Sequence, residues 1–259
     1  MNPVAFTLFG LEVRWYGIFI ACGALLAIFF AEKLIERNPR VPKEAVVDVS
    51  IFALPLGIIG ARAYYVFFEW EYYSAHLSEV LAIRNGGLAI HGGLLGGSLA
   101  IFIYCLAKKI NFFELMDMMA PGVVLAQGIG RWGNFMNGEA HGGVTTVPWA
   151  INVGGQMVHP TFLYESILDV GIFLFLYFCL SKKRRFPGEL AGAYMILYGI
   201  GRFFIEGLRT DSLYIGPLRT AQVVSIIGIF LGILLLIVQS KRIKTGDYAL
   251  KEEKAAINK

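Results

Sequence analysis

Residues 219–239 read RTAQVVSIIGIFLGILLLIVQ, a nearly unbroken apolar run of the length that crosses a bilayer as a helix. Of the 259 residues, 56% are hydrophobic and 16% are charged, against roughly 25% charged in soluble domains. The composition therefore predicts an all-α polytopic membrane protein, a single integral membrane domain over residues 1–259. Its seven expected spans are 15–32, 45–68, 88–107, 113–131, 161–181, 189–206 and 219–239.

Basic residues predict the orientation of these spans. The first thirteen residues, MNPVAFTLFGLEV, lack the basic start and cleavage site of a secretory signal, so the first span should be retained. Lysines and arginines follow every odd-numbered span, as in KKRR at 182–185 and KRIK at 241–244. By the positive-inside rule, the N-terminus is outside and the C-terminus is cytoplasmic.

Three segments outside the spans have compositions of their own. Residues 69–87 combine Trp and Tyr with Glu and predict an arm lying at the membrane interface. Residues 132–160 form a small extracytoplasmic loop region, and the mixed-charge residues 245–259 form a cytoplasmic tail. The overlapping GxxxG spacings of GGLLGG at 92–97 predict close helix packing.

The sixth span carries charges that hydrocarbon excludes. Tyr198, Arg202, Glu206 and Arg209 recur at helical spacing and form one stripe, while Arg131 stands at the outer end of the fourth span. An Arg202–Glu206 pair could merely stabilise the bundle. Two guanidiniums near one membrane surface, however, suit a phosphate. The anion present everywhere at that depth is a phospholipid headgroup.

Other polar residues are expected at the same outer face. GRWGNFMNGEAHGG at 130–143 offers the amides of Asn134 and Asn137 among glycines that permit close approach. His91 can exchange a proton near neutrality, although a lone histidine is more often a packing residue. Tyr16 is, by default, an interfacial belt tyrosine.

Several reaction classes have no motif here. HExxH, GxSxG and GxxxxGK[ST] are all missing from the sequence, which disfavours a zinc hydrolase, a serine hydrolase and an ATP-driven enzyme. We expect no metal, cofactor, nucleotide or nucleic-acid partner. The three cysteines lie in apolar runs and imply no disulfide framework.

The segment GRWGNFMNGE at 130–139 resembles the signature of the bacterial prolipoprotein diacylglyceryl transferase family. RWYG at 14–17, HGGL at 91–94, HPTFLYE at 159–165 and YGIGRFFIEGLR at 198–209 agree with it, in the family's order. The resemblance implies an enzyme of the bacterial cytoplasmic membrane, with its active site toward the outer leaflet. It would transfer the diacylglyceryl group of phosphatidylglycerol to the lipobox cysteine of lipoprotein precursors and release glycerol phosphate.

The resemblance also implies site residues. The hypothesis is that Arg131 and Arg202 hold the phosphate and that His91 takes the thiol proton, with His141, Glu139 and Glu206 as rivals for that role. The remaining motif positions are assigned to substrate binding: Tyr16, Asn134, Asn137, Glu139, Gly142, Tyr198, Glu206 and Arg209.

Charged residues within membrane spans are also compatible with other functional classes of membrane protein. A transporter or channel would use Arg202 and Glu206 to line a path, but neither GRWGNFMNGE nor YGIGRFFIEGLR recurs in the sequence. An intramembrane protease lacks its motifs, and a non-catalytic lipid-binding scaffold remains compatible with the sequence.

Overall fold

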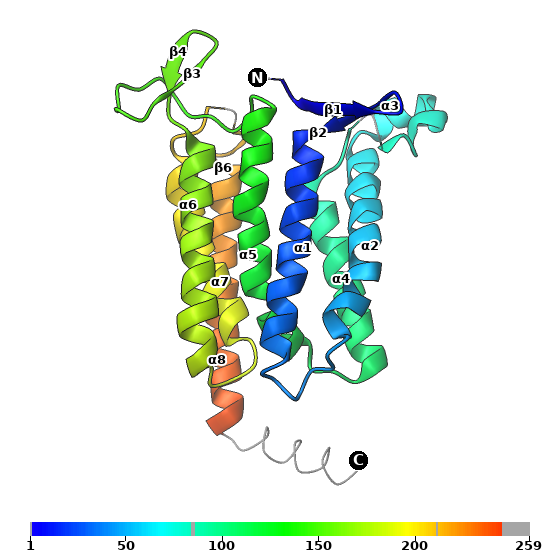
Figure 1. Ribbon diagram of the computed structural model, residues 1–259, viewed down its shortest axis with the longest axis vertical. Coiled ribbons are helices and arrows are strands. Elements are labelled where there is room, and N and C mark those ends of the chain that lie inside the picture. Colours follow the sequence, from blue (N-terminus) through cyan, green and yellow to red (C-terminus); the bar gives the residue numbers. More distant parts are fainter. Residues whose placement is uncertain (1, 84–85, 211, 245–259) are drawn as a thin grey trace. The chain divides into compact units, whose positions relative to one another are not determined.

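The chain is mostly helical in a computed structural model that describes residues 2–83, 86–210 and 212–244 (Figure 1). Within these residues, six helices are long and apolar enough to cross a membrane, which confirms a polytopic membrane protein. The tail predicted over 245–259 lies outside the described residues. The six helices are α1 (Trp15–Ile35), α2 (Ala45–Phe68), α4 (Ile90–Lys108), α5 (Phe112–Met136), α6 (Thr161–Leu174, continuing through η3, Phe175–Leu180, and η4, Ser181–Lys183) and α8 (Thr220–Lys244).

The predicted span at 189–206 is also a helix, α7 (Glu189–Glu206). It differs from the other six in composition, because Glu189, Arg202 and Glu206 interrupt its apolar surface. With 18 residues it is long enough, but it is too polar to be counted with the six. Its charged residues are satisfied within the protein, as described below.

The chain divides into two compact units. The first contains residues 1–34 and 116–259, and the second contains residues 35–115. In the first, α7 packs along α8, where a Cβ added at Gly232 would lie 2.9 Å from the carbonyl oxygen of Gly192. The second contains α2, α4, the short helix α3 (Trp70–Ala75) and the 3-10 turn η1 (Leu77–Glu79), the last two within the predicted interfacial arm.

Helices α2 and α4 pack through glycine. A Cβ at Gly96 would lie 3.1 Å from the carbonyl carbon of Leu56 and 3.3 Å from Cα of Gly60. At the neighbouring Gly97, the nearest atom is the carbonyl oxygen of Ala53, at an ordinary 3.7 Å. Of the two overlapping GxxxG spacings, the one formed by Gly92 and Gly96 is therefore the one that brings the two backbones together.

Within the described residues, three short antiparallel hairpins depart from the predicted all-α class. They are β1–β2 (Val4–Leu8 and Leu11–Arg14), β3–β4 (Ile151–Val153 and Gln156–Val158) and β5–β6 (Tyr214–Ile215 and Leu218–Arg219). In Figure 1 the β3–β4 hairpin projects beyond the end of α6. Hairpins this short leave only a weak alternation in the sequence, whereas the apolar runs dominate it.

Helix α5 extends further than the predicted span, which ends at residue 131. Its last turns contain Arg131 and Asn134, and the chain leaves the helix before Gly138, where φ is +76°. Glycines within GRWGN serve close packing instead of a turn: a Cβ at Gly133 would lie 2.7 Å from the ring of Tyr16 on α1. Arg131 thus projects from a regular helix and not from a loop.

Asp117 of α5 caps the start of α7. One of its oxygens accepts the backbone N–H of Ala191 at 2.9 Å, and the other accepts the N–H of Gly188 at 2.8 Å and Nη1 of Arg184 at 3.0 Å. The first N–H groups of a helix have no partner within it, and a negative charge there is favourable. This contact explains a fully buried carboxylate in a membrane-spanning helix.

Gly96→Ala should lower the stability of the protein, because the added methyl group would push against the backbone of α2. Overpacking of this kind costs about 1–3 kcal/mol. The matched change Gly97→Ala adds the same methyl group where there is room, and it should leave the thermal unfolding midpoint in detergent nearly unchanged. Equal midpoints for both variants would show that the packing described for Gly96 is wrong.

Candidate active site

The carboxylate of Glu165 on α6 forms ion pairs with three arginines from the chain segments around it. Its Oε2 lies 2.7 Å from Nη2 of Arg131 on α5, and its Oε1 is paired with Nη1 of Arg202 on α7. Nη1 of Arg209 lies 3.5 Å from the same Oε1. The two arginines expected to lie together are therefore neighbours, joined by an acidic residue.

Helix α7 contributes most of the remaining contacts. Nη2 of Arg202 pairs with Oε2 of Glu206 at 2.7 Å, one turn further along the helix. Nη2 of Arg131 donates to the hydroxyl of Tyr198 at 3.4 Å. Tyr198, Arg202 and Glu206 therefore form the predicted stripe. We refer to Arg131, Arg202, Arg209, Glu165 and Glu206 as the arginine cluster.

The arginine cluster is nearly closed to solvent. The side chains of its arginines are 14–20% exposed, whereas those of Glu165 and Glu206 are 1% and 4% exposed. Buried charges persist only when opposite charges and hydrogen bonds compensate them. Ser212 adds such a bond by donating its hydroxyl to Oε1 of Glu206 at 2.6 Å. The remaining exposure lies on the arginines, so an anion approaching the cluster meets positive groups first.

Arg209 lies beyond the end of α7 and is held by its main chain. It forms an isolated β-bridge with Gly142, and the N–H of Gly143 donates to the carbonyl of Leu208 at 3.0 Å. A Cβ at Gly142 would lie 2.7 Å from the Leu208 carbonyl oxygen. The glycine at 142 therefore permits the loop to approach the arginine cluster closely.

Asn134, Asn137 and Glu139 form a second group. The amide of Asn134 donates to Oε2 of Glu139 at 3.3 Å, and that of Asn137 donates to Oε1 at 3.5 Å. Glu139 was predicted to bind substrate, with the role of base as an alternative. In the structure its hydrogen bonds go to the asparagines, and Glu165 and Glu206 orient the arginines.

The tyrosine and histidine candidates occupy different places. Tyr16 is the second residue of α1 in the first unit and packs against Gly133. His91 is the second residue of α4 in the second unit, exposed, with its ring 6.0 Å from the ring of Tyr64. His141 lies in the loop after α5, where its Nδ1 is 3.4 Å from the carbonyl oxygen of Gly142.

Neither Glu165 nor Asp169, one turn further along α6, was predicted to be a site residue. Both are fully buried. Two carboxylates at i and i+4 inside an apolar run were a usable signal, because intramembrane charges require partners. The resemblance drew attention to Glu165 only as the last letter of HPTFLYE.

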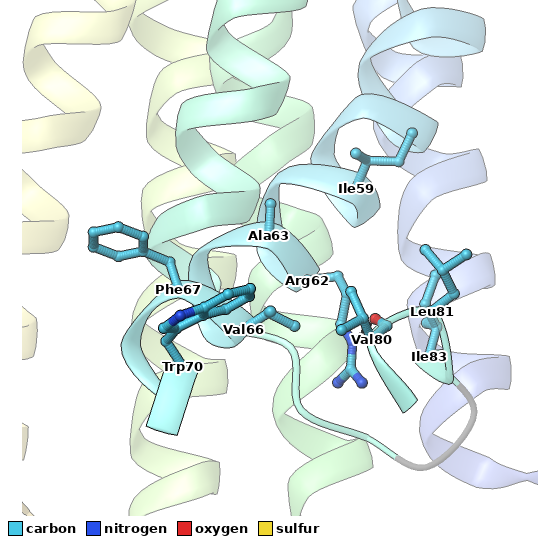
Figure 2. Close-up of a pocket in the computed structure, with 9 residues that line it drawn as sticks. All are labelled: Ile59, Arg62, Ala63, Val66, Phe67, Trp70, Val80, Leu81 and Ile83. Carbon is cyan, nitrogen blue, oxygen red and sulfur yellow. Dashed lines mark hydrogen bonds between the residues drawn. The ribbon is translucent and has the colours of Figure 1, made fainter. Parts of the chain in front are cut away.

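The second unit contains an apolar pocket of about 400 Å³ between α2, α3 and the segment after η1 (Figure 2). Arg62 of α2, itself 5% exposed, organises that segment. Its Nε donates to the carbonyl of Val80 at 2.8 Å, and its two terminal nitrogens donate to the carbonyls of Glu79, Gly86 and Gly87. Its role in the structure is to hold the arm against α2.

Comparison with known proteins identifies the family. Residues 3–238 match the model of a family described as prolipoprotein diacylglyceryl transferase. The phosphatidylglycerol–prolipoprotein diacylglyceryl transferase of Clostridioides difficile is 53% identical over 94% of this chain and 98% of its own length. Those of Finegoldia magna and Streptococcus uberis are 49% and 45% identical, over 95% and 93% of this chain and 99% and 96% of their own lengths. The chain therefore belongs to the prolipoprotein diacylglyceryl transferase family.

Proposed function

We propose that the chain transfers the diacylglyceryl group of phosphatidylglycerol to the lipobox cysteine of lipoprotein precursors, the first step of lipoprotein maturation. Its close relatives bear the name of this reaction, over nearly their whole length. The observation that carries the proposal is the convergence of Arg131, Arg202 and Arg209 on one buried carboxylate. Arginines so placed offer forked donors to the phosphate of a lipid.

Arg131 and Arg202 bind the phosphodiester and stabilise the charge that develops on its departing oxygen. The thiol sulfur attacks a glyceryl carbon, the carbon–oxygen bond breaks, and the electron pair remains on the phosphate. Donors aimed at a developing oxyanion are effective in a site that excludes water. The products are a thioether-linked diacylglyceryl cysteine and glycerol phosphate.

Glu165 and Glu206 are positioning residues for these guanidiniums. Each arginine has five N–H donors, so a carboxylate that takes one edge leaves other donors for a phosphate. The ion pairs also hold the arginine side chains in place before the substrate binds. Less side-chain conformational entropy is then lost on binding. Asn134 and Asn137 with Glu139, and Tyr16 and Tyr198, contact the headgroup and the peptide, while Gly142 lets the loop approach.

A base must take the thiol proton, because the thiolate is the effective nucleophile and free cysteine has a pKa near 8.5. His91 is the first candidate, with His141 and Glu139 as rivals. Glu206 is a weaker rival, since its carboxylate is buried and already bound to Arg202 and Ser212. A histidine that is exposed remains accessible to a peptide.

The basic residues give the proposed orientation. KKRR at 182–185 and KRIK at 241–244 favour a cytoplasmic C-terminus and an outer N-terminus, with α7 as a seventh crossing. The arginine cluster then faces the outer leaflet of the bacterial cytoplasmic membrane. Residues 69–87 lie at the interface as an arm, and residues 132–160 form the extracytoplasmic loop region.

The direct test supplies the purified chain in detergent with phosphatidylglycerol and a lipobox peptide. Mass spectrometry should detect a peptide that carries diacylglyceryl in thioether linkage. A shortened peptide would indicate a protease, and an unchanged peptide would indicate a scaffold or transporter.

Arg131→Ala and Arg202→Ala should each lower kcat about 10²–10³-fold, the usual effect of removing one donor to a developing oxyanion. Lysine at either position should restore only part of the rate, because it keeps the charge and loses the fork. The matched control is Arg185→Ala, which also breaks an ion pair with a glutamate but at a side chain 76% exposed. Wild-type turnover in either alanine variant would remove that arginine from the mechanism.

His91→Gln should lower the rate by about 10²–10⁴-fold at neutral pH, the usual contribution of a general base. The deficit should shrink as the pH rises toward 8.5, since the thiol then loses its proton without a base. His141→Gln and Glu139→Gln, measured over the same pH range, serve as comparisons. If one of these shows the deficit and His91→Gln does not, the base is that residue.

A further inference from the structure

Asp169 is a carboxyl group without a donor. It is fully buried on α6, one turn after Glu165. Among the residues that the structure describes, neither of its oxygens has a hydrogen-bond partner. A Cβ at Gly128 of α5 would lie 3.0 Å from Cβ of Asp169, so the neighbouring helix closes over this side chain.

Potential donors around Asp169 are engaged elsewhere or turned away. The ionisable groups that face it are Arg131 from α5, Glu165 from its own helix, and Arg202, Tyr194 and Tyr198 from α7. The Tyr194 hydroxyl donates to Gln127 at 2.8 Å, Nη2 of Arg131 goes to Glu165 and Tyr198, and both terminal nitrogens of Arg202 go to glutamates. Nε of Arg131 is also buried without an acceptor, so it does not reach Asp169 in this arrangement.

An ionised carboxylate loses its hydration on burial and recovers that loss only through hydrogen bonds and paired charges. Glu165 has both arginines in direct contact, whereas Asp169 has none. A protonated carboxyl group is far less costly to bury. Of the two acids on this face of α6, Glu165 is therefore the one that carries the negative charge.

We propose that Asp169 is a neutral carboxylic acid in the resting enzyme and that its proton sets the net charge of the arginine cluster. The arginine cluster contains three guanidiniums and two carboxylates. An ionised Asp169 would add a further negative charge beside Glu165 and would weaken the attraction of these arginines for the negative charge of a phosphodiester. Asp169 itself forms no ion pair with these arginines in the part of the chain that the structure describes, and the link between its proton and phosphatidylglycerol rests on the proposed function.

The test compares Asp169→Asn with the wild type. Asparagine has the size of the neutral acid, so KM for phosphatidylglycerol and kcat at neutral pH should stay within about threefold. If Asp169 is instead ionised, the same change removes a negative charge from a buried site. KM or kcat would then change tenfold or more, in either direction, and that result would overturn the proposal.

Glu165→Gln is the matched comparison, one turn earlier on the same face. It removes a carboxylate that contacts the arginines, and KM for phosphatidylglycerol should change at least tenfold. If Asp169→Asn does not fold, Asp169→Leu removes the same group without introducing a polar one, and the same threefold and tenfold limits apply.

Infrared difference spectroscopy provides a readout that does not require turnover. Subtracting the spectrum of the folded Asp169 variant from that of the wild-type protein should reveal the carbonyl stretch of a protonated carboxyl group. Carboxylate bands in its place would overturn the proposal. Because this signal concerns the resting protein, it stands apart from the transferase assay: failure of the assay alone would contradict the proposed function and leave the protonation state of Asp169 decided.

Discussion

The arrangement of the site depends on Glu165, a carboxylate that is almost fully withdrawn from water. Alone at that depth it would be strongly unfavourable, and so would Arg131 and Arg202. The opposite charges of Glu165 and the two arginines compensate one another. Their contacts join α5, α6 and α7 at one point. The proposed phosphate-binding arrangement is thus built from charges that also hold the helices together, so these arginines would have a structural role as well as the proposed functional one.

Other buried acids in the first unit solve the same problem differently. Asp117 is compensated by the free N–H groups at the start of α7 and by Arg184. Glu206 is compensated by Arg202 and Ser212. Asp169 lacks comparable contacts. The cost of burying its negative charge is therefore avoided only if its carboxyl group is protonated. These acids therefore differ in the hydrogen-bond donors that lie near them, since all of them are buried to a similar extent.

Much of the fold could be predicted from the sequence, because length and hydropathy determine which segments can cross a bilayer. Predicted spans such as 45–68 and 189–206 coincide with helices α2 and α7. The hairpins were missed because strands of two to five residues are set by local turns and contacts. The end of α5 was placed too early because glycines at 130 and 133 pack against α1 instead of breaking the helix.

At the site, Arg131, Arg202 and Glu206 were predicted to lie together, and they do. Glu165 was not predicted, since its partners come from other helices and spacing along one helix cannot reveal them.

The cap that Asp117 provides also sets a register. Helices α5 and α7 are fastened at one level by Asp117 with Gly188, and at another by Arg131 and Arg202 through Glu165. Fourteen residues separate Asp117 from Arg131, and fourteen separate Gly188 from Arg202, about 21 Å of helix in each case. The helical segments between the two contacts therefore have the same length. Inserting or deleting one residue in either would turn its arginine by about 100° around the helix axis, so the length of each intervening stretch is constrained.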